Sequence, residues 1–510
     1  MRFPQYIRSI SRQTAKIVVY NRKIYYNYNM KKTFYISCIA LISSLTTFSV
    51  FNPLKAVASN EKKLNVYYTS WAVYGNDYQT QHVRDLPWDR LSTINHSFWR
   101  IKPNEDLTEF PIVSADEWAD LGRNMCFDQY EEMTALYPNV DVLLAIGGWS
   151  DTKWFAEMAS TETGRKSFID SCIETMIKYP FLSGIDIDWE YPGTSRNYEG
   201  EGFIGSSADK DNFTALMKEM REAFDTADMT EKIITYCAPA GTGRLKSGEV
   251  CIDFAAVEPF VDRVNLMTYD MSGSWSKNAF HHSPLYPSKA VEFGASASEV
   301  VEYLISLGVT PSKINIGSPL YSQGFRVDAE NGEAALGQKI SGTAHGNLAN
   351  GQFRWFDLNR MESAEGWEAL YDEEAASAYL FNNDPESIFY QHFYTYESPR
   401  SLQAKLDYIN EMGLGGLIVW ETAGDPMDLD YPMLTQMARE LGIFKDERTE
   451  FIEAAIITDI DEPSISDENA DHQENYPFSS FLILIISLSL LLIIIVLLII
   501  AKSRNSKTNF

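Results

Sequence analysis

The sequence predicts an α/β protein built on a (β/α)8 TIM barrel that carries a small insertion and is followed by a C-terminal transmembrane helix. Short apolar runs alternate with amphipathic runs between residues 60 and 442, as strand–helix alternation requires. One connection between these runs is much longer than the others, and an uncharged apolar stretch lies near the C-terminus. The 510 residues, 45% of them hydrophobic, exclude an intrinsically disordered protein.

Eight apolar runs have the length and composition of buried strands. Eight is also the number of parallel strands that closes this kind of barrel. The predicted strands are 64–70, 91–99, 141–146, 184–188, 232–237, 263–268, 313–320 and 415–420. The helices predicted between them are 114–136, 167–178, 210–225, 296–307 and 399–412.

The connection between the last two predicted strands is about 95 residues long, too long for a single loop and helix. We therefore expect a small α+β insertion at about 321–393, between strand 7 and helix 7 of the barrel. The catalytic barrel with this insertion is expected to occupy residues 59–443.

The N-terminal segment predicts export from the cell. Residues 1–58 contain nine basic and no acidic side chains. Met30 begins a shorter leader, in which two lysines precede an apolar run and the small residues 56–58 form a cleavage site. We expect a signal peptide that is cleaved after Ala58, so that residues 1–29 are an overlong start or a basic leader. A retained N-terminal anchor is the alternative.

The C-terminal segment predicts membrane attachment. Residues 444–476 are acidic and lack apolar periodicity, which favours an extended stalk. Residues 481–501 carry no charge and are long enough to cross the roughly 30 Å hydrocarbon layer as a helix. Basic residues follow, so the tail 502–510 is expected to be cytoplasmic and the catalytic domain extracellular.

The charge balance limits the possible partners. The net charge of −27 repels phosphate backbones, which excludes nucleic acid as a partner. No cysteine pair has the spacing of a zinc site, and no glycine-rich phosphate loop precedes a helix, so we expect neither a metal nor another cofactor. The adjacent His281 and His282 are expected on a loop surface or in hydrogen bonds. We expect a monomer.

The residues with the clearest chemistry lie at the end of the fourth strand, where residues 183–190 read SGIDIDWE. Side chains alternate along a strand, so Asp186, Asp188 and Glu190 point to one face, which in a barrel is the packed interior. Burial and mutual repulsion disfavour their ionised forms, so a proton can stay on the row near neutral pH. The alternative is a solvated acidic edge strand, which the isoleucines between the acids disfavour.

This run resembles the signature D-G-x-D-x-D-x-E of the family 18 glycoside hydrolases, the chitinase family. The resemblance covers about residues 62–442 and includes further motifs in the same order. They are YYTSW at 67–71, AIGGWS at 145–150 with Ala in place of the first Ser of S-x-G-G, MTYD at 267–270, and the end of strand eight at 416–420.

The resemblance implies hydrolysis of β-1,4-N-acetylglucosamine linkages in chitin or chitooligosaccharides by a retaining, substrate-assisted endo-chitinase, without a cofactor. By resemblance, Glu190 is the acid that protonates the glycosidic oxygen and the base that later activates water. Asp188 holds the substrate acetamide, and Asp186 shares the proton stored below it. Tyr269 bonds the acetamide oxygen, and Asp270 contacts sugar hydroxyls.

Aromatic residues suit sugar binding because the C–H face of a pyranose stacks on an aromatic ring. By resemblance, Trp420 forms the floor under the reacting sugar. The other positions expected to bind substrate are Tyr67, Trp71, Phe98, Gly148, Trp149, Met267 and Tyr321.

Two positions depart from the family pattern. Ser183 replaces the first aspartate of the signature and removes one buried charge. Gln323 stands where many chitinases have arginine, so a neutral amide replaces a guanidinium.

Two alternative functions remain open. One is an endo-β-N-acetylglucosaminidase acting on N-glycan cores, against which the Trp-Glu-Tyr-Pro run and the insertion argue. The other is a catalytically inactive chitin-binding lectin, against which the presence of Glu190 argues.

Overall fold

The computed structural model describes residues 61–75, 80–196, 202–289 and 295–444. Eight strands within these residues correspond one by one to the predicted strands. They are β1 (Lys63–Thr69), β2 (Thr93–Ile101), β4 (Asp141–Gly147), β5 (Leu182–Asp188), β6 (Ile233–Pro239), β7 (Arg263–Met267), β8 (Ile314–Pro319) and β14 (Gly416–Trp420).

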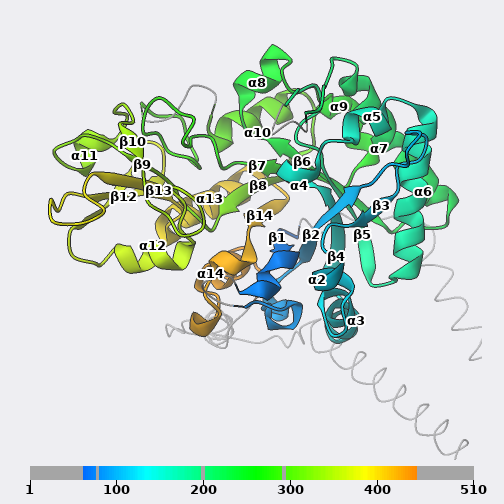
Figure 1. Cartoon of the computed structure of the whole chain (residues 1–510), viewed down its shortest axis with the longest axis horizontal. Helices are drawn as coiled ribbons and strands as arrows, with labels where there is room; N and C mark the ends of the chain where they lie inside the picture. Colours follow the sequence, from blue (N-terminus) through cyan, green and yellow to red (C-terminus); the bar gives the residue numbers. More distant parts are fainter. Residues whose placement is uncertain (1–60, 76–79, 197–201, 290–294, 445–510) are drawn as a thin grey trace, which may run out of the picture. The chain divides into compact units, whose positions relative to one another are not determined.

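These eight strands form a closed parallel barrel with helices around it (Figure 1). Their order is β1-β14-β8-β7-β6-β5-β4-β2, and β1 pairs in parallel with both β14 and β2. The sheet therefore closes on itself, and the predicted (β/α)8 barrel is confirmed. A ninth strand, β3 (Ile112–Ser114), pairs antiparallel with the end of β2.

The connections between the barrel strands and the segment after β14 carry the helices around the barrel. In chain order they are α2 (Glu117–Leu121), α3 (Cys126–Leu136), α4 (Gly148–Asp151), α5 (Phe155–Ala159), α6 (Glu162–Lys178), α7 (Asp209–Thr226), α8 (Thr242–Ser247), α9 (Phe254–Val257), α10 (Ala297–Ser306), α13 (Pro399–Met412) and α14 (Pro432–Glu440). Helix α13 has the predicted bounds because the Ser398 side chain caps its first turn and Gly413, at φ 66°, ends it.

The single helix predicted at 114–136 is wrong. The structure breaks this segment into the end of β3, α2 and α3. Asp116 caps α2 by accepting a hydrogen bond from the N–H of Ala119, and the chain turns at Asn124, whose φ is 61°. The amphipathic pattern extends across this turn, so the pattern alone does not reveal the break.

The long connection between β8 and α13 forms a second, antiparallel sheet (Figure 1, left). Its strand order is β10-β9-β13-β12-β11, and it has its own small apolar core around Phe325 and Phe393. Its elements are β9 (Gln323–Arg326), α11 (Gly332–Ala335), β10 (Gly342–Thr343), α12 (Trp355–Met361), β11 (Trp367–Asp372), β12 (Ser377–Asn382) and β13 (His392–Tyr396).

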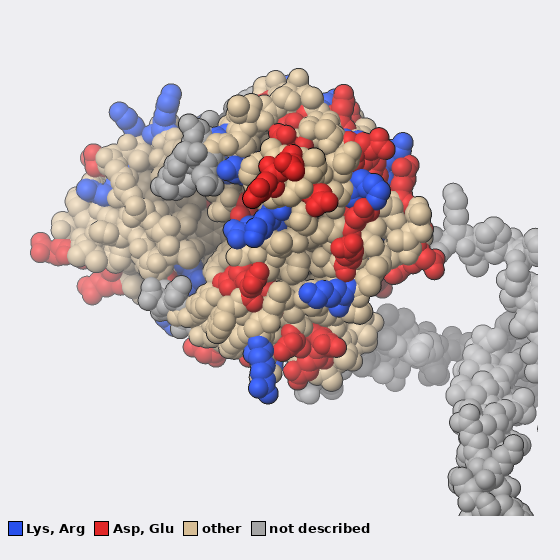
Figure 2. Space-filling model, turned by 45° about the vertical axis from the view of Figure 1, so that its right-hand side comes forward, with Lys and Arg blue, Asp and Glu red and all other residues tan. Residues whose placement is uncertain are grey.

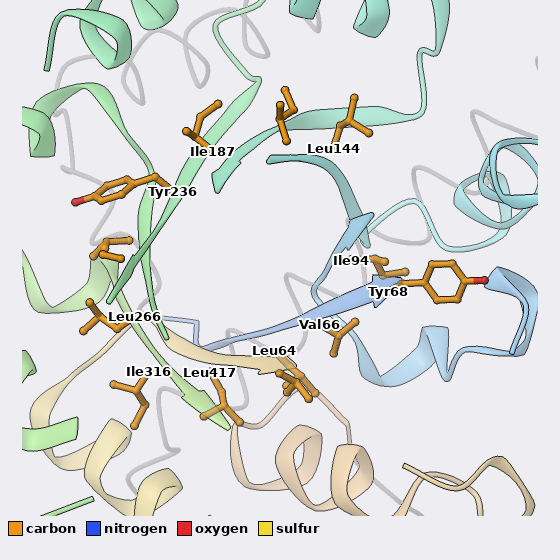
Figure 3. Packing of buried hydrophobic residues seen from close by; sticks show 14 of the residues in the cluster. Leu64, Val66, Tyr68, Ile94, Leu144, Ile187, Tyr236, Leu266, Ile316 and Leu417 are labelled. Carbon is orange, nitrogen blue, oxygen red and sulfur yellow. The ribbon is translucent and has the colours of Figure 1, made fainter. Parts of the chain in front are cut away.

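The main apolar core lies between the barrel strands and the surrounding helices. Alternate strand residues point outward into this layer (Figure 3). Leu64, Leu144, Ile316 and Leu417 are among them, and each is fully buried. The residues between them point into the barrel, so the side-chain alternation of each strand separates the packing face from the face that carries the site.

Among the described residues, no helix is both long and apolar enough to cross a bilayer. The leader at 1–58, the stalk from residue 445 onward, the predicted span at 481–501 and the tail at 502–510 lie outside the described residues. On the face shown in Figure 2, acidic side chains are spread among basic ones, and the described residues form no continuous basic patch there.

The packing of the outward-facing layer predicts that two Leu→Ala substitutions change the free energy of unfolding by very different amounts. We expect Leu144→Ala to lower the free energy of unfolding by about 3 kcal/mol, because it leaves a cavity in the packed layer. Leu136→Ala removes the same atoms from a side chain that is 66% exposed and should change it by less than about 0.5 kcal/mol. Urea unfolding of both variants would measure the difference, and equal effects would contradict this assignment of the core.

Candidate active site

The C-terminal ends of the barrel strands surround a cavity of about 960 Å³. The loops that follow each strand meet at this end, so side chains from distant parts of the chain come together. Eleven residues predicted from the sequence line the cavity: Tyr67, Trp71, Phe98, Trp149, Asp188, Glu190, Met267, Tyr269, Asp270, Tyr321 and Trp420. The other two predicted residues contact the lining: Asp186 accepts a hydrogen bond from Tyr67, and Gly148 packs against the ring of Phe98.

Asp186 is fully buried among hydrogen-bond donors. Its carboxylate accepts from the hydroxyl of Tyr67 (2.8 Å), from Nδ2 of Asn265 (3.1 Å) and from the hydroxyl of Thr235. The thiol of Cys237 lies 3.7 Å from the same carboxylate. Burial raises the pKa of Asp186, and these hydrogen bonds oppose the rise because they favour the charged form.

Asp188 has far fewer partners. Its Oδ1 is buried and has no hydrogen-bond partner among the described residues. Burial raises the pKa of Asp188 well above its usual range, and the negative charges of Glu190 and Asp186 raise it further. Asp188 therefore holds a proton more tightly than an exposed aspartate, and it lines the cavity with one carboxyl oxygen unpartnered.

Glu190 follows the end of β5 and is partly buried at the cavity wall. Its backbone N–H donates to the hydroxyl of Thr152 (2.9 Å). Burial raises the pKa of Glu190 to about 7, although a hydrogen bond with Tyr191 and the charge of Arg196 oppose the rise. A carboxyl group with this pKa is protonated in a substantial fraction of molecules near neutrality, as a general acid requires.

Aromatic rings form a continuous part of the cavity lining. The ring centroid of Trp420 lies 5.7 Å from that of Tyr67 and 5.7 Å from that of Phe98, and the ring planes of Trp420 and Phe98 make an angle of 21°. Trp71 lies 6.4 Å from Phe98. Gly148 allows this arrangement, because a Cβ there would lie 2.7 Å from the Phe98 ring. Such a surface fits the C–H face of a sugar ring.

Asp270 lies on another part of the wall, three residues after the end of β7. Its φ is 54°, a left-handed conformation that few non-glycine residues adopt. Nε2 of Gln323 donates to Oδ1 of Asp270 (2.7 Å), so the neutral amide noted as a departure from the family contacts this carboxylate. Tyr269 and Tyr321 pack edge to face beside it, with their rings 6.3 Å apart.

The other departure, Ser183, lies where the pairing of β4 with β5 shifts register, between the pairs of Leu182 and Gly184. Ser183 is partly buried, and none of the hydrogen bonds to Asp186 described above comes from it. The loss of the first aspartate of the signature therefore leaves the contacts of the carboxylate row in place.

Several residues of the site were not predicted from the sequence. Arg244, in α8 after β6, and Trp275, in the loop after β7, line the cavity. Arg196 packs over Trp149, with its guanidinium carbon 3.9 Å from the ring centroid, and it donates to the Trp149 carbonyl oxygen. These residues lie in the connections after β5, β6 and β7 and outside the motifs quoted above, so only their residue types could have suggested them.

A second aromatic pair lies next to the cavity. The rings of Tyr74 and Trp118 stack 5.4 Å apart, and both side chains are exposed. The Tyr74 hydroxyl donates to Oδ2 of Asp116 (2.6 Å), which lines the cavity. The exposed aromatic surface therefore continues beyond the cavity.

The expectation that His281 and His282 lie on a loop surface is wrong, because both are fully buried. The insertion covers their loop: Nε2 of His281 lies 3.2 Å from the Asp372 carboxylate of β11. The alternative expectation, hydrogen bonding, therefore fits the side chain of His281.

One group among the described residues has ligand atoms close enough to share a metal ion. In His96, Asp120 and Cys126 these atoms lie within 4.8 Å of one another. His96 Nε2 is already 2.9 Å from Asp120 Oδ1, the Ser114 hydroxyl donates to the other oxygen (2.5 Å), and none of these residues lines the cavity. We assign the group to packing between β2 and the helices α2 and α3.

Comparison with known proteins agrees with this geometry. The model of the glycosyl hydrolases family 18 matches residues 63–425. The chain belongs to this family. It is therefore a glycoside hydrolase, and the cavity at the C-terminal ends of the strands is its candidate active site.

This family 18 protein is similar to Chitinase A1 of Niallia circulans, with 27% identity over 444 residues that cover 78% of this chain and 61% of the relative. It is also similar to Endochitinase 1 of Metarhizium robertsii, with 29% identity over 381 residues, 71% of this chain and 81% of the relative. The chain thus spans less than two thirds of Chitinase A1.

Among solved structures, the Group II chitinase catalytic domain 2 of Ostrinia furnacalis, a mutant in complex with penta-N-acetylchitooctaose, (NAG)5, matches with a TM-score of 0.65. The identity is 25%, over 76% of this chain and 97% of that one.

The raised pKa of Glu190 predicts a pH-dependent gain in stability for Glu190→Gln. A group whose pKa rises from 4.5 to about 7 on folding destabilises the native state as pH increases through this interval. The amide does not titrate, so the variant should gain on the order of 3 kcal/mol at pH 8 and nothing at pH 4.

Urea unfolding at both pH values would measure this gain. The exposed Glu131→Gln is the matched control and should show no gain at either pH. A gain for Glu190→Gln that is the same at pH 4 and pH 8 would contradict the raised pKa.

Proposed function

We propose that this protein is an endo-chitinase that hydrolyses β-1,4 linkages between N-acetylglucosamine units with retention of configuration. The observation that carries the proposal is the pair of Glu190 and Asp188 at the cavity. A carboxyl group that is protonated near neutral pH lies beside a second carboxyl group with an unpartnered oxygen. The two relatives named above are a chitinase and an endochitinase.

In the proposed first step, Glu190 donates its proton to the glycosidic oxygen. The oxygen of the substrate's own 2-acetamido group attacks the anomeric carbon while the bond to the leaving sugar breaks, which gives an oxazolinium intermediate. In the second step, Glu190 takes a proton from a water molecule. The water oxygen attacks the same anomeric carbon, which opens the oxazolinium ring and restores the 2-acetamido group. Two inversions at that carbon give net retention.

The polar groups around Glu190 fit this sequence. Asp188 has the unpartnered Oδ1 that could accept the acetamide N–H and hold the group in place for attack. The hydroxyl of Tyr269 would donate to the acetamide oxygen. Asp186 receives several hydrogen bonds, so it is the better place for a negative charge, and the proton that the two aspartates share would stay on Asp188.

The aromatic surface supports a polymeric substrate. The rings of Trp420, Phe98 and Trp71 would stack on sugars inside the cavity. The exposed pair Tyr74 and Trp118 would meet units of the same chain farther out. A site that contacts several units at once favours cleavage within a chain.

The proposal predicts the products from defined substrates. We expect dimers and trimers from N-acetylglucosamine hexamers, no glycan release from a high-mannose glycopeptide, and β-anomers as the initial products. Glu190→Gln should lower kcat by at least about 10²-fold and retain hexamer binding, because only the proton is lost. Mass spectrometry identifies the products, and proton NMR identifies the anomer.

Each other outcome of this experiment would contradict the proposal in a different way. Glycan release would indicate an N-glycan endo-β-N-acetylglucosaminidase. Binding without turnover in the unmodified protein would indicate a lectin. Unchanged hydrolysis by Glu190→Gln would contradict the role of Glu190.

We also propose that the catalytic domain acts outside the cell, exported by the leader at 1–58 and held by the apolar segment 481–501. The support is the hydropathy and charge pattern of the sequence. A chain that stops after residue 476 should appear in the culture medium, whereas the full chain should stay with the membranes. Secretion of both forms would contradict the anchor.

A further inference from the structure

The imidazole of His282 is fully buried, and neither ring nitrogen has a hydrogen-bond partner among the described residues. Its backbone, in contrast, is held: the N–H donates to the hydroxyl of Thr395 (3.4 Å), and the carbonyl accepts from the N–H of Met271 (3.0 Å). An imidazole has at least one N–H to donate, and burying it without an acceptor is unfavourable. The ring therefore has an unused donor in a fixed position.

Two cavity residues lie next to this ring. Nδ1 of His282 is 3.8 Å from Oδ1 of Asp270, and the ring centroid is 5.5 Å from that of Tyr321. Gln323 donates to the same oxygen of Asp270 (2.7 Å). The Asp270 side chain is 43% exposed. Gln323 therefore holds Oδ1, while the remainder of the carboxylate is accessible from the cavity.

We infer that His282 is a positioning residue for Asp270: the imidazole N–H of His282 donates to Oδ1 of Asp270 and holds this carboxylate in the orientation that accepts a sugar hydroxyl. The inference rests on the proposed function, because it takes the ligand of the cavity to be an oligosaccharide. A closer approach of about 1 Å turns the observed separation into a hydrogen bond.

The protonation state decides the strength of this contact. A charge-assisted bond from imidazolium to carboxylate is stronger than a bond from a neutral imidazole. A neutral imidazole with its proton on Nδ1 can still donate to Oδ1, but the contact is weaker. Binding of the oligosaccharide should therefore take up a proton and should be tighter in acid.

The other titratable groups near His282 are known from the structure. Tyr321 faces the ring from the end of β8, and His281 precedes it in the loop. The next residue, Ser283, accepts from Lys405 of α13, which is paired with Glu397. Only a comparison with a variant at position 282 separates the contribution of His282 from theirs.

The test measures hexamer binding to the full chain by titration calorimetry in a Glu190→Gln background, which removes both turnover and the titration of Glu190. The second protein also carries His282→Asn. From pH 5.5 to pH 8, we expect the affinity to fall about tenfold in the protein that keeps His282 and by less than about twofold in the His282→Asn protein. Buffers of different ionisation enthalpy should show proton uptake on binding only where His282 is present.

Two controls separate this role from a structural one. The affinities of the two proteins should differ least at pH 8, so an equal loss of affinity at every pH in the His282→Asn protein would overturn the inference. His345→Asn, at an exposed histidine outside the cavity lining, should bind as the parent does.

The same titrations distinguish this inference from the proposed function. Parallel pH dependences, with and without His282, would overturn the role of His282 and leave the proposed function intact. Absence of hexamer binding at every pH would contradict both.

Discussion

The row of carboxyl groups on β5 is the constraint on which the rest of the site depends. Three acidic side chains at alternate positions must share the interior of a closed barrel, where their ionised forms are costly. The hydrogen bonds that offset this cost are distributed unequally among the three carboxyl groups. Asp186 receives hydrogen bonds from β1, β6 and β7, whereas Asp188 has an oxygen without a partner. The resulting imbalance leaves protons on the row near neutral pH, where acid catalysis needs them.

The closed barrel makes this imbalance possible. The donors to Asp186 come from three strands, β1, β6 and β7, and β1 reaches Asp186 only because it pairs with both β14 and β2. The apolar outer layer holds the strands in register. A substitution in that layer is therefore expected to lower the stability of the barrel rather than to change the chemical groups of the site. At the mouth, the aromatic rings and Asp270 face a cavity that the row closes from below.

The insertion also contributes a residue to this site. Its first strand begins at Gln323, which bonds Asp270. A buried ion pair, Lys405 with Glu397 (2.5 Å), joins the segment after β13 to α13, and the Ser283 and Ser318 hydroxyls bond the same pair. The loop that carries His282 is thereby enclosed between the barrel and the insertion, which explains why a pair of histidines expected on a surface is buried.

The sequence by itself determined the eight strands, the row of acidic residues on β5 and most of the aromatic lining, because strand periodicity and strand-end motifs are local properties. It predicted a continuous helix where the chain turns at Asn124, and a surface loop where His282 is buried. Only the tertiary structure decided which donors reach Asp186, which oxygen of Asp188 is unpartnered, and that Arg196 packs on Trp149. These contacts join residues far apart in the chain, and their geometry exists only after the barrel closes.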